Sequence, residues 1–164
     1  MSTLPEPWLR GPLTGIHPLL APVFYAFQHA REDLRQATEG LDPARLWERP
    51  HGLTPVGFHL RHIAGSVDRL ATYLQGLPLT AAQLSELDQE SQPGADRDEL
   101  LDTVDRAFTR AEQVFRAIDP ATLPDARTVG RRHLPTTVIG LLTHIAEHTL
   151  RHVGEVVVTA KLLK

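Results

Sequence analysis

Histidines are concentrated in two short windows of this sequence. Of the nine histidines in the 164-residue chain, one window holds His59 and His62, and the other holds His144, His148 and His152. A spacing of three or four residues places side chains on the same face of an α-helix. Two imidazoles at positions i and i+4 can converge on one metal ion. The pattern therefore predicts a metal site between two helices.

Helical geometry indicates which of these histidines point inward. With about 100° per residue, His152 and His148 lie about 20° and 60° from the apolar stripe of their window, and His144 lies at its edge, about 100° away. In the first window the same arithmetic slightly favours His59 over His62. A single histidine on an apolar face is more often an ordinary core residue. Several buried imidazoles without a shared ligand would be costly, which favours a metal.

The overall composition excludes several classes of protein. The chain has no cysteine, so disulfides, zinc ribbons and cysteine nucleophiles are excluded. A net charge of −3 and a pI of about 6.3 do not suit a nucleic-acid-binding protein. No apolar run approaches the ~20 residues of a membrane span, and Met1–Gly11 lacks the pattern of a signal peptide. We expect one cytoplasmic domain spanning residues 1–164, with a small-molecule substrate and no nucleic-acid or membrane partner.

Four segments repeat apolar residues in steps of three and four, the pattern of amphipathic helices. We expect long helices from Pro18–Pro22 to Gly40, from Thr54-Pro55 to Gly76, from Asp96 to Ile118, and from Thr136 or Thr137 to about Leu163. A short helix is expected near residues 80–90, and no strand is expected. The fold class is therefore all-α, a four-helix bundle. Its long connections leave room for crossovers, so a simple up-down-up-down order is not assured.

Both histidine windows resemble motifs of the DinB/YfiT-like family of metalloenzymes, which is distinct from the DNA polymerase of similar name. TPVGFHLRHIAGSVDRL resembles the second-helix motif, and LLTHIAEHTLRHVGEVV resembles the last-helix motif, in which HxxxH is followed closely by Gly-Gln. The resemblance implies a four-helix bundle with His62, His148 and His152 as the three metal ligands. It thus selects His62, where helical geometry alone selects His59. The family's Gln corresponds here to Glu155, either an outer partner of a ligand, a weak extra ligand or a solvated carboxylate.

Three imidazoles on one divalent ion would leave coordination positions open, as in catalytic sites. Zinc, nickel and iron all suit such ligands. Characterised members of the family include transferases that join a low-molecular-weight thiol to an electrophile, so the resemblance implies a thiol cosubstrate. A metal-dependent hydrolase and a non-catalytic, stress-related metal-binding protein stay open as alternatives. Because ligation needs neutral imidazoles with an ordinary pKa of ~6.5, metal occupancy should fall below about pH 6.

The end of the last expected helix has apolar residues on more than one face. Val156-Val157-Val158 is followed by Leu162-Leu163, and Val157 lies about 120° from the inward stripe. One bundle cannot easily bury both faces, which predicts a homodimer formed through this helix or its end. The alternative is a covering segment from the same chain, such as the one around Trp8.

Overall fold

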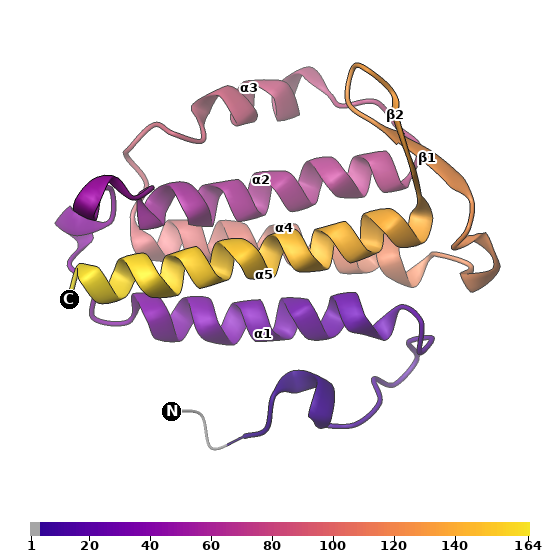
Figure 1. Cartoon of the computed structure of the whole chain (residues 1–164), viewed down its shortest axis with the longest axis horizontal. Helices are drawn as coiled ribbons and strands as arrows, with labels where there is room; N and C mark the ends of the chain where they lie inside the picture. The colour runs from indigo at the N-terminus through magenta and orange to yellow at the C-terminus, as the bar shows by residue number, and fades with distance from the viewer. Residues whose placement is uncertain (1–3) are drawn as a thin grey trace.

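Four long helices make up most of the structure, a computed structural model that describes residues 4–164. They are α1 (Ala21–Thr38), α2 (Val56–Leu74), α4 (Arg97–Arg116) and α5 (Val138–Leu162). The all-α four-helix bundle predicted from the sequence is confirmed (Figure 1). The first residues of the N-terminal stretch discussed above, residues 1–3, lie outside the described part of the chain. Within the described part, no helix is long and apolar enough to cross a membrane.

The helices are not connected in a simple up-down-up-down order. α1 packs against α4 and α5, and α2 packs against the same two helices. α1 and α5 run in one direction, whereas α2 and α4 run in the other (Figure 1). The α1–α2 and α4–α5 connections therefore join opposite corners of the bundle, a crossover that their length permits. This arrangement sets α2 and α5 side by side and antiparallel.

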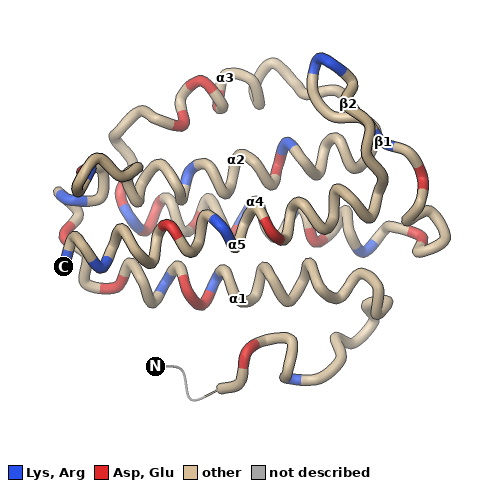
Figure 2. The backbone as a smooth tube through the Cα atoms, in the orientation of Figure 1, with Lys and Arg blue, Asp and Glu red and all other residues tan. Residues whose placement is uncertain are grey.

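The short elements lie in the connections and in the segment before α1. α3 (Ala81–Gln89) packs along the outside of α2 (Figure 1), as the expected short helix. Four short 3-10 helices are η1 (Pro7–Leu9), η2 (Pro43–Arg45), η3 (Pro50–Gly52) and η4 (Pro120–Thr122). Acidic and basic residues are interspersed along the bundle helices (Figure 2).

The apolar stripes of the four long helices form one core. Phe27 of α1 and Phe108 of α4 are fully buried, and their rings stack with centroids 4.0 Å apart. Leu60 of α2 and Ile145 of α5 are likewise completely inaccessible to solvent. Burying each such side chain contributes roughly 1.5–3 kcal/mol. The core therefore explains why segments of modest helix propensity are held as long helices.

Helix termini follow the capping residues of the sequence, with one shift. Asp96 accepts a hydrogen bond from the Glu99 amide at 2.9 Å, and Glu99 accepts one from the Asp96 amide at 3.0 Å, which closes a capping box. Thr137 caps α5. The second long helix was expected to start at Thr54-Pro55, but α2 begins at Val56 and Pro55 occupies the cap position. Proline has no side-chain acceptor, so this end has no side-chain cap.

A small hairpin appears where no strand was expected. β1 (Ala126–Val129) and β2 (Leu134–Thr137) pair antiparallel, with Ala126 opposite Thr137 and Val129 opposite Leu134. Strands of four residues are too short for a clear alternation in the sequence, and they are specified by pairing with each other. The hairpin leads directly into α5 and so sets where that helix begins.

Candidate metal centre

Three histidines from two helices converge between α2 and α5. One ring nitrogen from each of His62, His148 and His152 lies within 4.8 Å of the others. His62 Nε2 is 3.0 Å from His148 Nε2, and the His62 and His148 rings lie 4.5 and 4.6 Å from the His152 ring, between centroids. Two imidazole nitrogens bound to one tetrahedral zinc ion, each about 2.0–2.1 Å from it, would be about 3.3 Å apart. The donor set and its spacing therefore fit one divalent metal ion.

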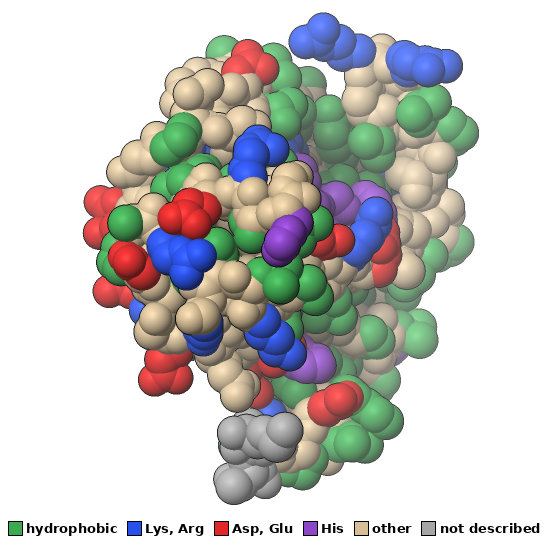
Figure 3. All heavy atoms as spheres, turned by 60° about the vertical axis from the view of Figure 1, so that its left-hand side comes forward, with side chains coloured by type: hydrophobic (Ala, Val, Ile, Leu, Met, Phe, Trp, Pro, Cys, Tyr) green, Lys and Arg blue, Asp and Glu red, His purple; other side chains and the backbone are tan. Residues whose placement is uncertain are grey.

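The antiparallel packing of α2 and α5 explains this convergence. His148 and His152 are one turn apart on α5, so both face the same side of that helix. They meet His62 on the facing side of α2. All three side chains are half-buried, and histidine side chains lie partly recessed in the molecular surface (Figure 3). Each of the three is therefore still partly accessible to solvent.

His59 lies behind this cluster rather than within it. Its side chain is buried, and its Nδ1 lies 2.9 Å from His152 Nδ1. Its Nε2 is buried without a hydrogen-bond partner among residues 4–164. His59 thus contacts the outer nitrogen of His152, and His62 is the α2 histidine whose nitrogen joins the other two.

Burial favours the neutral imidazole at His59, His148 and His152. It lowers the pKa of His59 and of His148 from 6.5 to about 4, and the nearby His62 adds to both shifts. Burial lowers the pKa of His152 further, to about 3, again with a contribution from His62. Metal ligation requires the neutral imidazole. Protons should therefore displace a metal only at a pH lower than the value of about 6 expected for ordinary histidines.

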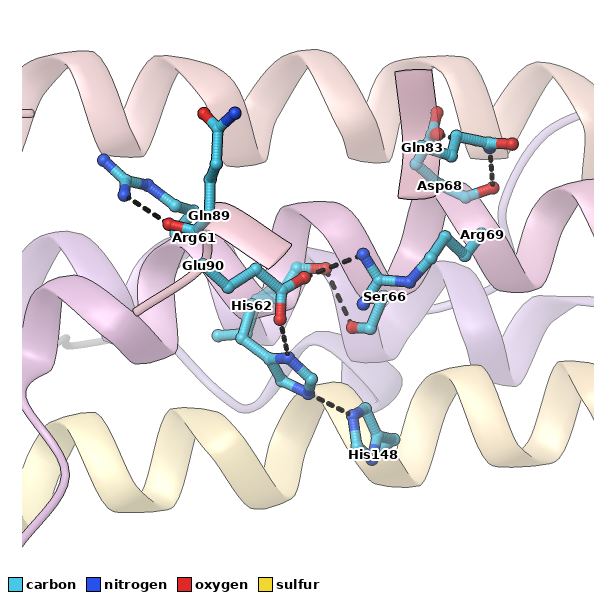
Figure 4. Close-up of polar contacts among 10 residues, drawn as sticks. Arg61, His62, Ser66, Asp68, Arg69, Gln83, Gln89, Glu90 and His148 are labelled. Atoms are coloured by element: carbon cyan, nitrogen blue, oxygen red, sulfur yellow. Dashed lines mark hydrogen bonds and ion pairs between the residues drawn. The ribbon is translucent and has the colours of Figure 1, made fainter. Parts of the chain in front are cut away.

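The buried carboxylate of Glu90, which the sequence analysis did not identify, contacts the outer nitrogen of His62. Glu90 Oε2 lies 2.6 Å from His62 Nδ1, and Glu90 Oε1 lies 2.7 Å from Arg69 Nη1 (Figure 4). The Glu90 side chain is only 5% exposed. A Cβ atom at Gly65 would lie 2.6 Å from Glu90 Oε1, so glycine leaves the room that the carboxylate fills.

Little in the sequence singles out Glu90. It sits in a polar stretch, 28 residues from His62, at the C-terminal cap of α3.

The other candidates from the sequence lie at the edge of the site or away from it. His144 is adjacent to His148, with ring centroids 5.2 Å apart, but its side chain is 47% exposed and its Nδ1 lies 2.7 Å from Glu147. Glu155 is exposed, and no hydrogen bond or ion pair involves it in the described part of the chain. The geometry of Glu155 therefore fits a solvated carboxylate rather than an outer partner of a ligand.

The arginines near the histidines are bound to protein groups. Arg69 pairs with Glu90, and Arg151 donates to Glu147 at 2.8 Å. Arg61 donates to the backbone carbonyls of Gln89, at 3.0 Å, and Gln92. Each of these arginines therefore already has a protein partner in this conformation.

Comparisons with known proteins agree with this architecture. The model of the DinB superfamily matches residues 26–156. Among solved structures, the chain is similar to YfiT from Bacillus subtilis, described as a probable metal-dependent hydrolase with an unusual four-helix bundle topology. That similarity has a TM-score of 0.67 at 17% sequence identity and covers 92% of this chain and 91% of that one. It shows a shared fold. No curated protein matches the chain.

Proposed function

Because the chain belongs to the DinB superfamily, we propose that its three converging histidines bind a divalent metal ion such as zinc, nickel or iron. The observation that carries this proposal is the meeting of one nitrogen each from His62, His148 and His152. The lowered pKa values of His148 and His152 support it, because neutral imidazoles are the form that binds metals. Three protein ligands leave coordination positions for water or a substrate, as in catalytic sites.

The proposed reaction is transfer of a low-molecular-weight thiol to an electrophile. A divalent metal in such a site would lower the pKa of a bound thiol or water molecule. The carboxylates bonded to histidines of the two windows are Glu90 and Glu147, and each is also paired with an arginine. Neither is an unpaired carboxylate beside the three converging nitrogens. This favours a thiol, whose pKa of ~8.5 makes it far easier to ionise than water.

In that reaction the thiol sulfur forms a bond to carbon. With a haloarene the carbon–halogen bond breaks, the halide leaves with the bonding electrons, and the thiol proton passes to solvent. The chain itself has no cysteine, so the sulfur must come from a cosubstrate. The role of the chain is to hold the metal through the three imidazoles, of which burial favours the neutral form at His148 and His152.

Metal-dependent hydrolysis is the second candidate. The similarity to YfiT, itself described as a probable metal-dependent hydrolase, favours it. Water would then replace the thiol as the nucleophile at the same site. A non-catalytic, stress-related metal-binding role would retain the site without either reaction.

Metal analysis of protein purified without a histidine tag tests the site directly. We expect about one divalent ion per chain, and its loss in His62→Ala, His148→Ala or His152→Ala, because two ligands chelate more weakly than three. His59→Ala should weaken binding less, and His29→Gln on α1 is the matched control. Retention of the metal in His62→Ala together with its loss in His59→Ala would show that His59 is the ligand from α2.

An activity screen separates the reactions. The metal-loaded protein should accelerate the reaction of a small thiol with a haloarene, and apoprotein and His152→Ala should not. Adding metal should restore the rate in wild-type apoprotein only. Several cellular thiols must be included, since one inactive thiol decides nothing. Hydrolysis of esters or amides without thiol transfer would support the second candidate, and no reaction across the panel would support the non-catalytic role.

A further inference from the structure

Glu90 reaches the candidate metal centre from an element outside the bundle. It caps the C-terminus of α3, and the α3–α4 connection that follows is held against α2. Arg61 donates hydrogen bonds to carbonyls on both sides of Glu90, those of Gln89 and Gln92. The Trp47 indole donates to the carbonyl of Ala95 at 3.1 Å, further along the connection. Hydrogen bonds from side chains to backbone carbonyls therefore fix the position of Glu90 beside α2.

The other end of α3 is fixed to α2 by polar contacts as well. The Gln83 side-chain amide donates to Asp68 Oδ2 at 2.6 Å and to Thr72 Oγ1 at 2.8 Å. In contrast, Leu84 and Leu87 of α3 are 37% and 40% exposed. α3 is thus positioned on α2 by directed hydrogen bonds more than by apolar burial. Such contacts set orientation more narrowly than nonpolar packing does.

The contact with Glu90 determines which nitrogen of His62 carries a proton. A carboxylate only accepts hydrogen bonds, and a neutral imidazole has one N–H. The 2.6 Å contact with Glu90 Oε2 therefore places that proton on His62 Nδ1. Nε2, which lies 3.0 Å from His148 Nε2, then carries the lone pair. That is the form in which His62 can bind a metal.

The three clustered histidines differ in the group that contacts the outer ring nitrogen. His152 has an imidazole, His59, at its Nδ1, and His148 Nδ1 is buried without a partner among residues 4–164. In the same part of the chain, Glu90 is the one carboxylate bonded to any of the three. Arg69 balances its buried charge at 2.7 Å, since an unpaired carboxylate there would be strongly unfavourable.

We propose that Glu90, supported by Arg69, is a positioning residue of the metal centre, which holds the His62 ring in its metal-binding tautomer before any metal arrives. This role rests on the proposed metal-binding function. Hydrogen bonds from a ligating histidine to a carboxylate orient the ring and increase its strength as a ligand. Glu90 acts through His62 and does not itself touch the metal.

Nitrogen-15 NMR of the metal-free protein tests the tautomer without any metal. Wild type should show His62 protonated at Nδ1, and Glu90→Ala should shift the proton toward Nε2. Glu90→Gln should largely preserve the wild-type tautomer, because its amide oxygen still accepts a hydrogen bond. A His62 tautomer unchanged in Glu90→Ala would overturn the proposed role of Glu90.

Cobalt(II) binding gives the second readout. Glu90→Ala should weaken cobalt affinity by about 10–100-fold, the usual effect of losing such a partner, and Glu90→Gln should weaken it less. Glu155→Ala, which removes an exposed carboxylate of α5, is the matched control and should bind as wild type does. The visible spectrum of bound cobalt should keep its three-imidazole character in Glu90→Gln.

A paired variant covers the case in which Glu90→Ala folds poorly. Glu90→Leu with Arg69→Met removes both charges and leaves neither buried alone. It should fold and show the same tautomer shift and loss of cobalt affinity. Wild-type tautomer and affinity in this variant would refute the positioning role. If wild-type protein binds no cobalt, the proposed function fails, and the NMR result still decides whether Glu90 positions His62.

Discussion

Each of the three clustered histidines, His62, His148 and His152, has one ring nitrogen facing the other two. The second nitrogen of each ring has a different neighbour. The outer nitrogen of His62 meets the carboxylate of Glu90, and that of His152 meets the imidazole of His59. His148 Nδ1 has no hydrogen-bond partner among residues 4–164. A charged acceptor increases ligand strength more than a neutral one does. We therefore expect His62 to be the strongest of the three donors.

The lowered histidine pKa values predict how the metal-free protein responds to pH. Burial lowers the pKa values of His59 and His148 to about 4 and that of His152 to about 3. In the unfolded chain these groups titrate near ~6.5. Below that pH the unfolded state binds more protons than the folded state, so stability should fall as pH drops from about 6.5 to about 4. Chemical denaturation of apoprotein at several pH values measures this.

The change in the free energy of unfolding between pH 7 and pH 5 reports most directly on these histidines. At lower pH, carboxylates such as Glu32 contribute, because its hydrogen bond from Arg10 lowers its pKa. His59→Gln should reduce the pH dependence by up to about one proton. Stability that does not change between pH 7 and pH 5 would contradict the buried, neutral imidazoles.

At the scale of elements, two helical glycines have opposite surroundings. A Cβ atom at Gly57, near the start of α2, would lie 2.6–2.8 Å from three ring atoms of Trp47. A Cβ atom at Gly154 of α5 would meet nothing within 4 Å. The glycine of α2 therefore allows the Trp47 indole to pack directly on the helix backbone.

We expect alanine to have opposite effects at these positions. Gly57→Ala should destabilise the fold by about 1–3 kcal/mol through overpacking against Trp47. Gly154→Ala should stabilise it by up to about 1 kcal/mol, because alanine has the higher helix propensity. Urea unfolding of both variants beside wild type measures the difference. Equal effects at the two sites would show that Trp47 does not limit the space at α2.

At the scale of the whole molecule, the apolar end of α5 is partly covered by the bundle itself. Val156 and Leu163 are buried, and Val157 packs against the core. Val158 and Leu162 are 53% and 48% exposed. The apolar surface available to a partner is therefore smaller than the sequence pattern alone predicts. The two exposed residues are one turn apart and share a face.

A homodimer through this face is the association that we propose. Light scattering at micromolar concentration should give twice the chain mass for wild type and the monomer mass for Val158→Arg with Leu162→Arg. The matched control is Leu19→Arg with Ile139→Arg, which places charges on exposed residues of a different apolar groove, between α1 and α5. A monomeric wild type would refute the dimer, and dissociation by the control pair alone would move the interface to that groove.

Much of this architecture was predictable from local pattern. Steps of three and four between apolar residues identified all four long helices, and Asp96 and Thr137 marked two of their starts. The same periodicity placed His148 and His152 on one inward face of α5. These features depend on residues within one or two turns of each other, so a sequence displays them directly. The four-residue strands of the hairpin were not predicted, because each is specified only by pairing with the other.

The choice between His59 and His62 required more than helical geometry. Both lie within reach of α5, and the precise rotation of α2 against its neighbours decides which nitrogen joins the cluster. The family resemblance selected His62, and the packing of α2 on α5 brings that residue to His148. Bundle helices that contact two neighbours at once can rotate by tens of degrees from an ideal wheel.

Sequence alone therefore determined the helices, their apolar faces and a short list of candidate metal ligands among the histidines. Tertiary structure decided which imidazoles converge and which group contacts the outer nitrogen of each ring. Glu90 is the clearest case, because it reaches His62 only after α3 has docked on α2 and through space that Gly65 leaves open. Contacts of this kind depend on the relative placement of separate elements. No local spacing encodes that placement, because it follows from packing the whole chain at once.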